Sequence, residues 1–247
     1  MSPVPRAGAA LDLLLLLTVT LILPLGQALA SELLDPNAGL AGFSPLLAVG
    51  KWFDALLLIV LAAYFRRRNA LPASAFGLQT DHLGRQVLWS VPMLAAIYVA
   101  LIPMIVIVSV LLYLVPQVTQ DLEHRLRFVE LLPLGRLSDT LLLLIPVAIH
   151  EELLFRGLLI PYLRRVGLGW LGAIFASSAV FAVLHVTQGW LAILQVFGIG
   201  LVLSGCFVLS RSLLAVMLAH FFFDFIQMQI LPFLVRWLEQ LLPGQAP

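Results

Sequence analysis

Long runs of apolar residues are the feature that most restricts how this chain folds. A run of about 20 such residues crosses the hydrocarbon core of a bilayer as one helix. Hydrophobic residues make up 62% of the 247-residue sequence and charged residues 11%, whereas charged residues make up about 25% of a soluble domain. The sequence therefore predicts an all-α, polytopic membrane helix bundle. It excludes a soluble enzyme, a disordered chain and a disulfide scaffold.

About seven transmembrane helices are predicted from these runs. An amphipathic segment at residues 233–242 would add an eighth helix, lying on the membrane surface. The predicted spans cover residues 10–30, 46–65, 87–115, 139–161, 169–186, 190–210 and 213–232.

The first apolar run has two interpretations. Arg6, the apolar stretch that follows it and the tripeptide Ala28-Leu29-Ala30 are typical of a cleaved signal peptide. The length of the run and the position of Asp12 near its start favour an uncleaved helix. Both interpretations stay open at this point.

The distribution of positive charge bears on partners and location. The net charge is +1, and the longest basic tract is Arg66, Arg67 and Arg68, so the sequence indicates no nucleic-acid partner. Inner loops of membrane proteins carry an excess of arginine and lysine, and a cytoplasmic N-terminus places more of the arginines inside. We expect a multi-pass protein of the cell membrane whose partner is the lipid bilayer.

Charged residues within the fourth predicted span are the strongest functional signal. An ionisable side chain inside a membrane costs several kcal/mol unless it is paired or hydrated. Glu152 and Arg156 are four residues apart and share a helix face, so they can pair. Glu151 lies about 100° around the helix from Glu152, and its charge is left uncompensated. We therefore expect Glu151 to act on water or substrate.

Two later spans also carry ionisable residues. His185 lies near the end of the fifth span, where a lone histidine is more often a packing or hydrogen-bonding residue. His220 and Asp224 are four residues apart in the seventh span and share a face. A carboxylate beside a histidine fixes the histidine tautomer or supports it as a metal ligand. Five further charged residues lie near predicted span ends, where their side chains can reach water: Asp12, Lys51, Asp54, Asp139 and Arg211.

These residues support two kinds of hydrolytic chemistry. Glu151, His185 and His220 could bind a divalent metal such as zinc and leave one position open for water. Without metal, a glutamate can act as general base on water while a histidine donates to the oxyanion. His150-Glu151 begins like the zinc motif H-E-x-x-H, but residue 154 is Leu. Both the metal-dependent and the metal-free mechanism stay open.

Three motifs in this order resemble those of a known family. They are Glu151-Glu152-x-x-x-Arg156, Phe181-x-x-x-His185 and His220-x-x-x-Asp224. Together they resemble the E-E-x-x-x-R, F-x-x-x-H and H-x-x-x-N/D motifs of the CAAX prenyl endopeptidase-like membrane proteins, also called the CPBP or Abi family. The resemblance covers residues 138–232 as a protease-like core. Residues 1–137 then form N-terminal membrane helices of unassigned role, and residues 233–247 form a C-terminal tail.

The resemblance implies an intramembrane protease with a water-filled cavity between its helices. Carried over to this sequence, Glu151 and His185 would activate the attacking water, and Glu152 and Arg156 would support them. His220 and Asp224 would stabilise the oxyanion or complete a metal site. The better-described prenyl-protein proteases have Asn where this chain has Asp224. An ionised Asp is a poor oxyanion donor, so we expect Asp224 to orient His220.

The function expected from sequence is an intramembrane endopeptidase that cleaves a membrane-associated protein or peptide. Two alternatives remain: a non-catalytic scaffold or immunity protein held together by the polar network, and a proton-coupled transporter. A transporter predicts matched halves with helices broken by Gly and Pro, and the sequence shows no such symmetry. The oligomeric state is left open.

Overall fold

The computed structural model describes residues 6–22, 45–115, 119–121 and 136–230, and every regular element in this part of the chain is helical. The all-α membrane bundle is therefore confirmed. The α-helices are α1 Arg6–Leu17, α3 Pro45–Arg68, α4 Leu83–Leu114, α6 Leu137–Glu152, α7 Ile160–Arg165, α8 Trp170–Val183, α9 Trp190–Ser210 and α10 Leu213–Phe225. Three π-helical segments are η1 Thr18–Ile22, η4 Leu153–Leu159 and η6 Ile226–Ile230, and two short 3-10 turns are η3 Ala73–Phe76 and η5 Val186–Gln188.

Four of the described helices are long and apolar enough to cross a membrane: Leu47–Arg68, Leu83–Leu114, Trp190–Ser210 and Leu213–Ile230. They coincide with the second, third, sixth and seventh predicted spans. The first and fifth predicted spans correspond to shorter apolar helices, Gly8–Thr20 and Trp170–Val183. The fourth span is the continuous helix α6–η4–α7, which carries the charged cluster. The predicted amphipathic helix at 233–242 lies outside the described residues.

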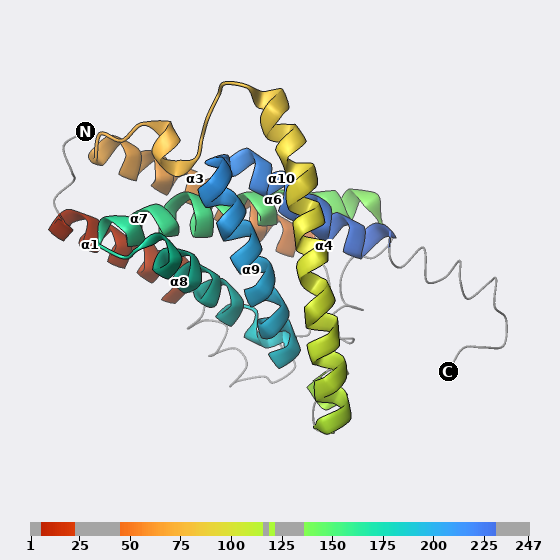
Figure 1. The fold of residues 1–247 in the computed structure, drawn as a ribbon. Coiled ribbons are helices and arrows are strands. Elements are labelled where there is room, and N and C mark those ends of the chain that lie inside the picture. Colours follow the sequence, from red (N-terminus) through yellow and green to blue (C-terminus); the bar gives the residue numbers. More distant parts are fainter. Residues whose placement is uncertain (1–5, 23–44, 116–118, 122–135, 231–247) are drawn as a thin grey trace.

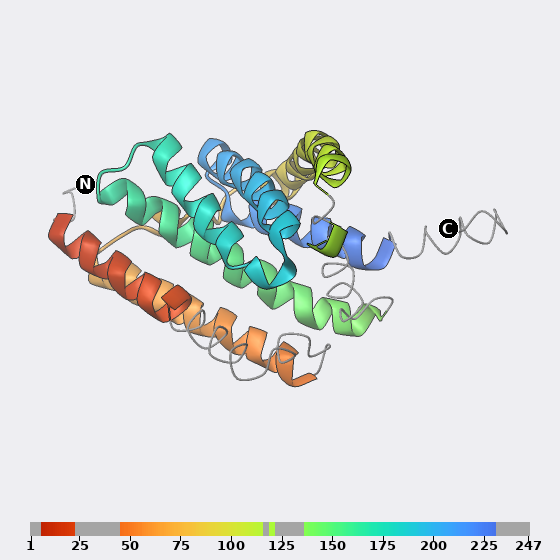
Figure 2. The same ribbon diagram turned by 90° about the horizontal axis from the view of Figure 1, so that it is seen from below.

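The helix α6–η4–α7 runs through the centre of the bundle (Figures 1 and 2). Helix α3 packs against α6 and α1 packs against α7 on one side. Helices α8 and α9 pack against each other on the opposite side, and α10 contacts both α6 and α4. The central helix is therefore covered on both sides, and its polar residues are shielded from lipid.

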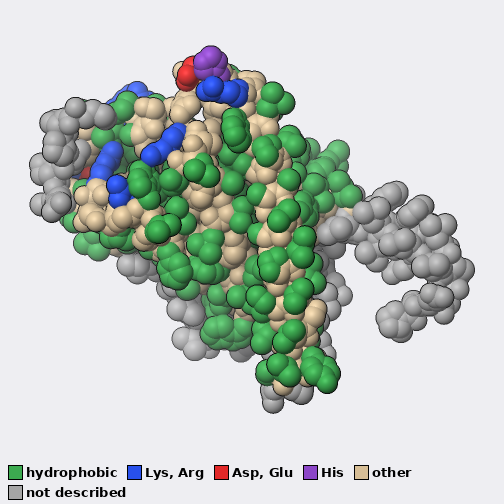
Figure 3. Space-filling view, in the orientation of Figure 1, with side chains coloured by type: hydrophobic (Ala, Val, Ile, Leu, Met, Phe, Trp, Pro, Cys, Tyr) green, Lys and Arg blue, Asp and Glu red, His purple; other side chains and the backbone are tan. Residues whose placement is uncertain are grey.

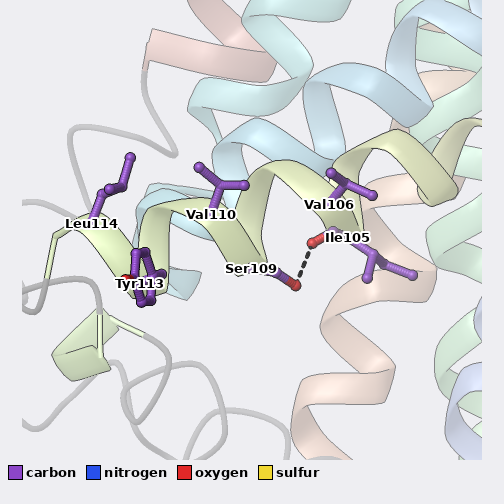
Figure 4. A pocket seen from close by; sticks show the side chains of 6 residues that line it. All are labelled: Ile105, Val106, Ser109, Val110, Tyr113 and Leu114. Atoms are coloured by element: carbon purple, nitrogen blue, oxygen red, sulfur yellow. Dashed lines mark hydrogen bonds between the residues drawn. The ribbon is translucent and has the colours of Figure 1, made fainter.

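The exposed surface is largely apolar, as a bilayer requires. Figure 3 shows hydrophobic side chains over most of one face, with lysine and arginine confined to its upper part. Part of α4 carries a shallow apolar pocket away from the charged cluster (Figure 4). The hydroxyl of Ser109 in this pocket donates to the carbonyl oxygen of Ile105 at 2.8 Å, so the helix itself satisfies it. The residues that line the pocket are Ile105, Val106, Ser109, Val110, Tyr113 and Leu114.

Asp12 differs from the sequence expectation. It is buried rather than reaching water at a span end, and Asn69 Nδ2 donates to its Oδ2 atom at 2.7 Å. Arg68 Nη1 lies 3.2 Å from Asp12 Oδ1, and the Tyr162 hydroxyl donates to Oδ2 at 3.4 Å. Asp12 thus ties α1 to α3 and α7. The tripeptide at residues 28–30 lies outside the described residues.

Replacing Asp12 with Asn is expected to destabilise the protein by about 1–3 kcal/mol, because it removes the charge that its buried and charged partners require. Thermal unfolding of the purified protein in detergent measures this. The matched control is Asp54→Asn, because Asp54 forms a solvent-accessible pair with Lys51 at 3.9 Å and such pairs contribute about 0–1 kcal/mol. Equal effects of the two substitutions would contradict a structural role for Asp12.

Candidate active site

The centre of the candidate site is a change of helix type. Helix α6 ends at Glu152 and continues as the π-helical segment Leu153–Leu159, in which every residue is buried. A π-helix has wider turns than an α-helix, and π-helical turns occur frequently at functional sites. The segment carries Arg156 into the interior beside Glu152. Pro161 follows in α7, near its start.

Glu152 and Arg156 form a fully buried ion pair, with 2.8 Å between Oε1 and Nη1. This confirms the pairing predicted from their spacing. Arg156 Nη2 also donates to the carbonyl oxygen of Gly200 at 3.2 Å, which joins the central helix to α9. The guanidinium carbon lies 4.7 Å from the centre of the Phe181 ring. Arg156 thus connects three helices around one carboxylate.

His220, on α10, contacts the same Glu152 carboxylate. Its Nδ1 atom lies 2.7 Å from Glu152 Oε1. Its Nε2 atom lies 3.3 Å from Asp224 Oδ2, as expected for a shared helix face, and 3.8 Å from Glu151 Oε2. Three carboxylates therefore surround one imidazole ring. Because a carboxylate only accepts, His220 donates to Glu152 through Nδ1–H and fixes its ring there.

Glu151 is the least constrained carboxylate on the central helix. Its side chain is 21% exposed, whereas that of Glu152 is fully buried. Among the described residues it accepts no hydrogen bond within normal distance, and its ion-pair contact is with His220 Nε2 at 3.8 Å. Its carboxylate oxygens therefore stay available to a water molecule. As expected, Glu152 takes the ion pair with Arg156, whereas Glu151 has the longer 3.8 Å contact with His220.

His185 follows the end of α8, at the start of the η5 turn. Its Nδ1 atom lies 2.8 Å from the carbonyl oxygen of Phe181. Because a carbonyl only accepts, Nδ1 carries the proton and the Nε2 lone pair of the neutral ring is left available. No hydrogen bond or ion pair joins His185 to Glu151 or His220 in the described part of the chain. His185 is linked to the cluster through Phe181 instead.

Phe181 is the residue whose position sequence reasoning missed. Its ring lies edge-on to both histidines, with centroid distances of 4.8 Å to His185 and 6.1 Å to His220. It also lies beneath the Arg156 guanidinium. The sequence feature that could have indicated this position is that Phe181 precedes His185 by four residues, which places both on one helix face. Sequence reasoning also missed that the Gly200 carbonyl accepts a hydrogen bond from Arg156. The sequence feature that could have indicated it is the Gly198-x-Gly200 pattern, which is typical of closely packed helices.

The metal ligands proposed from the sequence are Glu151, His185 and His220. Within the described residues, no group of three or more His, Cys, Asp or Glu side chains is arranged to hold a metal ion. Among the described residues, His185 reaches the cluster through the Phe181 ring, and both nitrogens of His220 face carboxylates. As arranged, Glu151, His185 and His220 do not fit a metal ion as a set of ligands.

One family model matches the part of the chain that holds this site. Residues 133–226 match the family model described as Rce1-like, type II CAAX prenyl endopeptidase Rce1-like. The matched segment contains all three motifs, and it confirms the family resemblance that those motifs indicate. No curated protein and no solved structure matches the chain.

Proposed function

We propose that this protein, whose residues 133–226 form an Rce1-like domain, is an intramembrane endopeptidase that cleaves a membrane-associated protein or peptide. The observation that carries the proposal is the partly exposed Glu151 carboxylate, which accepts no hydrogen bond from described residues and lies beside a buried His220. A scaffold needs its charges paired, whereas a general base needs a free lone pair facing water.

In the proposed reaction, Glu151 takes a proton from a water molecule while the water oxygen bonds to the carbonyl carbon of the peptide. His185 Nε2 accepts the second hydrogen bond of that water and orients it. The π electrons of the carbonyl move onto its oxygen, which His220 stabilises through Nε2–H. When the C–N bond breaks, the nitrogen keeps the bonding electrons and receives the proton held by Glu151.

Glu152, Arg156 and Asp224 have positioning roles in this proposal. Glu152 fixes His220 through Nδ1, and Arg156 balances the Glu152 charge in the interior. Asp224 faces the other ring nitrogen and supports the positive charge that His220 carries when both nitrogens are protonated. The family description supports a prenylated substrate with a C-terminal Cys-a-a-X sequence. The apolar surface of the bundle suits a substrate that is embedded in lipid.

The proposal is tested by mapping protein termini in the membranes and secreted fractions of the native host, with this protein present and absent. We expect specific new termini that appear only when the protein is present. A synthetic peptide that spans such a site should then be cleaved at the same bond by the purified protein. Identical termini across varied growth conditions would contradict the proposal and favour the scaffold alternative.

A separate prediction concerns His185. Replacing it with Phe should lower kcat by about 10²-fold or more, because the water loses the acceptor that orients it. Thermal stability should change little, since among the described residues the ring makes one hydrogen bond, to a backbone carbonyl. Cleavage of the same peptide and thermal unfolding measure the two effects. Full activity in His185→Phe would exclude His185 from the reaction.

A further inference from the structure

Tyr98 is a polar residue that neither the motifs nor the matched segment include. It lies in α4, which packs against α10 and α9. Its ring packs on Phe223 with a centroid distance of 5.5 Å. Its hydroxyl oxygen is buried and has no hydrogen-bond partner among the described residues. A buried hydroxyl without a partner is unfavourable, and such a group in a native fold calls for an explanation.

The position of Phe223 places Tyr98 beside the candidate site. Phe223 and Asp224 follow His220 by three and four residues, so all three occupy one side of α10. The Tyr98 ring therefore packs on the side of α10 that carries His220 and Asp224.

The cluster is rich in acceptors and poor in donors. Glu151, Glu152 and Asp224 present carboxylates around His220, and an ionised carboxylate cannot donate to an oxyanion. His220 Nε2–H is one donor, and it lies near the two partly exposed carboxylates, Asp224 and Glu151. A tyrosine hydroxyl is neutral, carries one proton and stays a donor at neutral pH. Tyr98 thus supplies the kind of group that the cluster lacks.

We propose that Tyr98 is a catalytic residue whose hydroxyl donates a hydrogen bond to the carbonyl oxygen of the scissile peptide bond. This inference rests on the proposed endopeptidase function. As the water oxygen bonds to the carbonyl carbon, the π electrons move onto the carbonyl oxygen. The Tyr98 O–H and His220 Nε2–H then hold that oxygen together. Tyr98 keeps its own proton throughout, and Glu151 carries the proton taken from water.

The proposal gives α4 a part in the chemistry, although this helix precedes the matched residues 133–226. A hydroxyl with a purely structural role would be hydrogen-bonded within the fold, and its loss would lower stability. A hydroxyl that waits for substrate has no such bond to lose. Its removal should therefore lower turnover and leave the stability of the unliganded protein unchanged.

The test compares Tyr98→Phe with the control Tyr113→Phe in the full-length protein, reconstituted in lipid nanodiscs. Tyr113 lies on the same helix and is 86% exposed. The probe is a synthetic peptide that ends in a farnesylated Cys-a-a-X sequence. For Tyr98→Phe we expect kcat to fall by about 10²- to 10³-fold, as for the loss of one oxyanion donor. KM and the unfolding midpoint should stay unchanged, and Tyr113→Phe should match wild type in all three.

A second measurement separates a catalytic from a structural role. A peptide aldehyde of the same sequence forms a hydrate that resembles the tetrahedral intermediate. Tyr98→Phe should bind this aldehyde at least about 10-fold more weakly, as expected when one donor to the oxyanion is lost, and should bind the uncleaved peptide with unchanged affinity. Wild-type kcat in Tyr98→Phe would overturn the inference, and so would an equal loss of affinity for both ligands. A wild-type protein that cleaves nothing would overturn the proposed function itself.

Discussion

Replacing Glu151 with Gln should lower kcat for peptide cleavage by about 10²- to 10⁴-fold, the range supplied by a positioned general base. Glutamine keeps the size and polarity of the side chain but cannot accept a proton from water. Because Glu151 accepts no hydrogen bond from described residues, the fold loses no such contact. The unfolding midpoint should therefore stay within the error of wild type.

The matched control for this variant is Asp139→Asn. Asp139 lies on the same helix, α6, and its side chain is 24% exposed, close to the 21% of Glu151. It pairs with Arg136 at 3.8 Å, away from the site. Cleavage of the peptide by purified protein should be normal in the control. A Glu151→Gln protein that is folded and still cleaves at the wild-type rate would remove Glu151 from the mechanism.

The second large effect, a loss of stability, is expected when Arg156 is replaced. Replacing it with Met should destabilise the protein by about 3–5 kcal/mol, because the buried Glu152 carboxylate loses its arginine and, among the described residues, keeps the hydrogen bond from His220 alone. The backbone carbonyl of Gly200 also loses its donor. Thermal or denaturant unfolding in detergent measures the change, and a lower yield of folded protein in membranes should accompany it.

A double substitution isolates the charge effect. In Glu152→Gln/Arg156→Met the interior charge is gone, and the amide oxygen of Gln can still accept from His220 Nδ1. We expect this protein to recover a large part of the lost stability. Arg136→Met is the control, because Arg136 is exposed and its ion pair is weak. A double variant no more stable than Arg156→Met would show that the loss arises from packing rather than charge.

The membrane bundle could be predicted because spans are local properties of the sequence. The sixth predicted span, residues 190–210, coincides with α9, and the boundaries of the other described spans differ by a few residues. Pairs four residues apart could also be predicted, because a helix places them on one face. Glu152 with Arg156 and His220 with Asp224 are such pairs, and both are close in space.

Contacts between distant residues could not be predicted. Nothing in the sequence indicates that Asp12 is buried against Tyr162, or that Tyr98 packs on Phe223. Nothing indicates which of the two adjacent glutamates meets His220 at 2.7 Å. Such contacts depend on how helices pack, and residues far apart in the chain meet only after packing.

By itself the sequence determined that this protein is a helical membrane bundle and that its ionisable residues gather on three helices. The reason is that hydrophobicity and helix period act over a few neighbouring residues. Only the tertiary structure decided that His220 lies 2.7 Å from Glu152 and 3.8 Å from Glu151, and that the Phe181 ring contacts both His185 and His220. Those outcomes depend on the π-helical turn after Glu152 and on the packing of α8, α9 and α10 around it, because small rotations of a helix decide which carboxylate faces the interior.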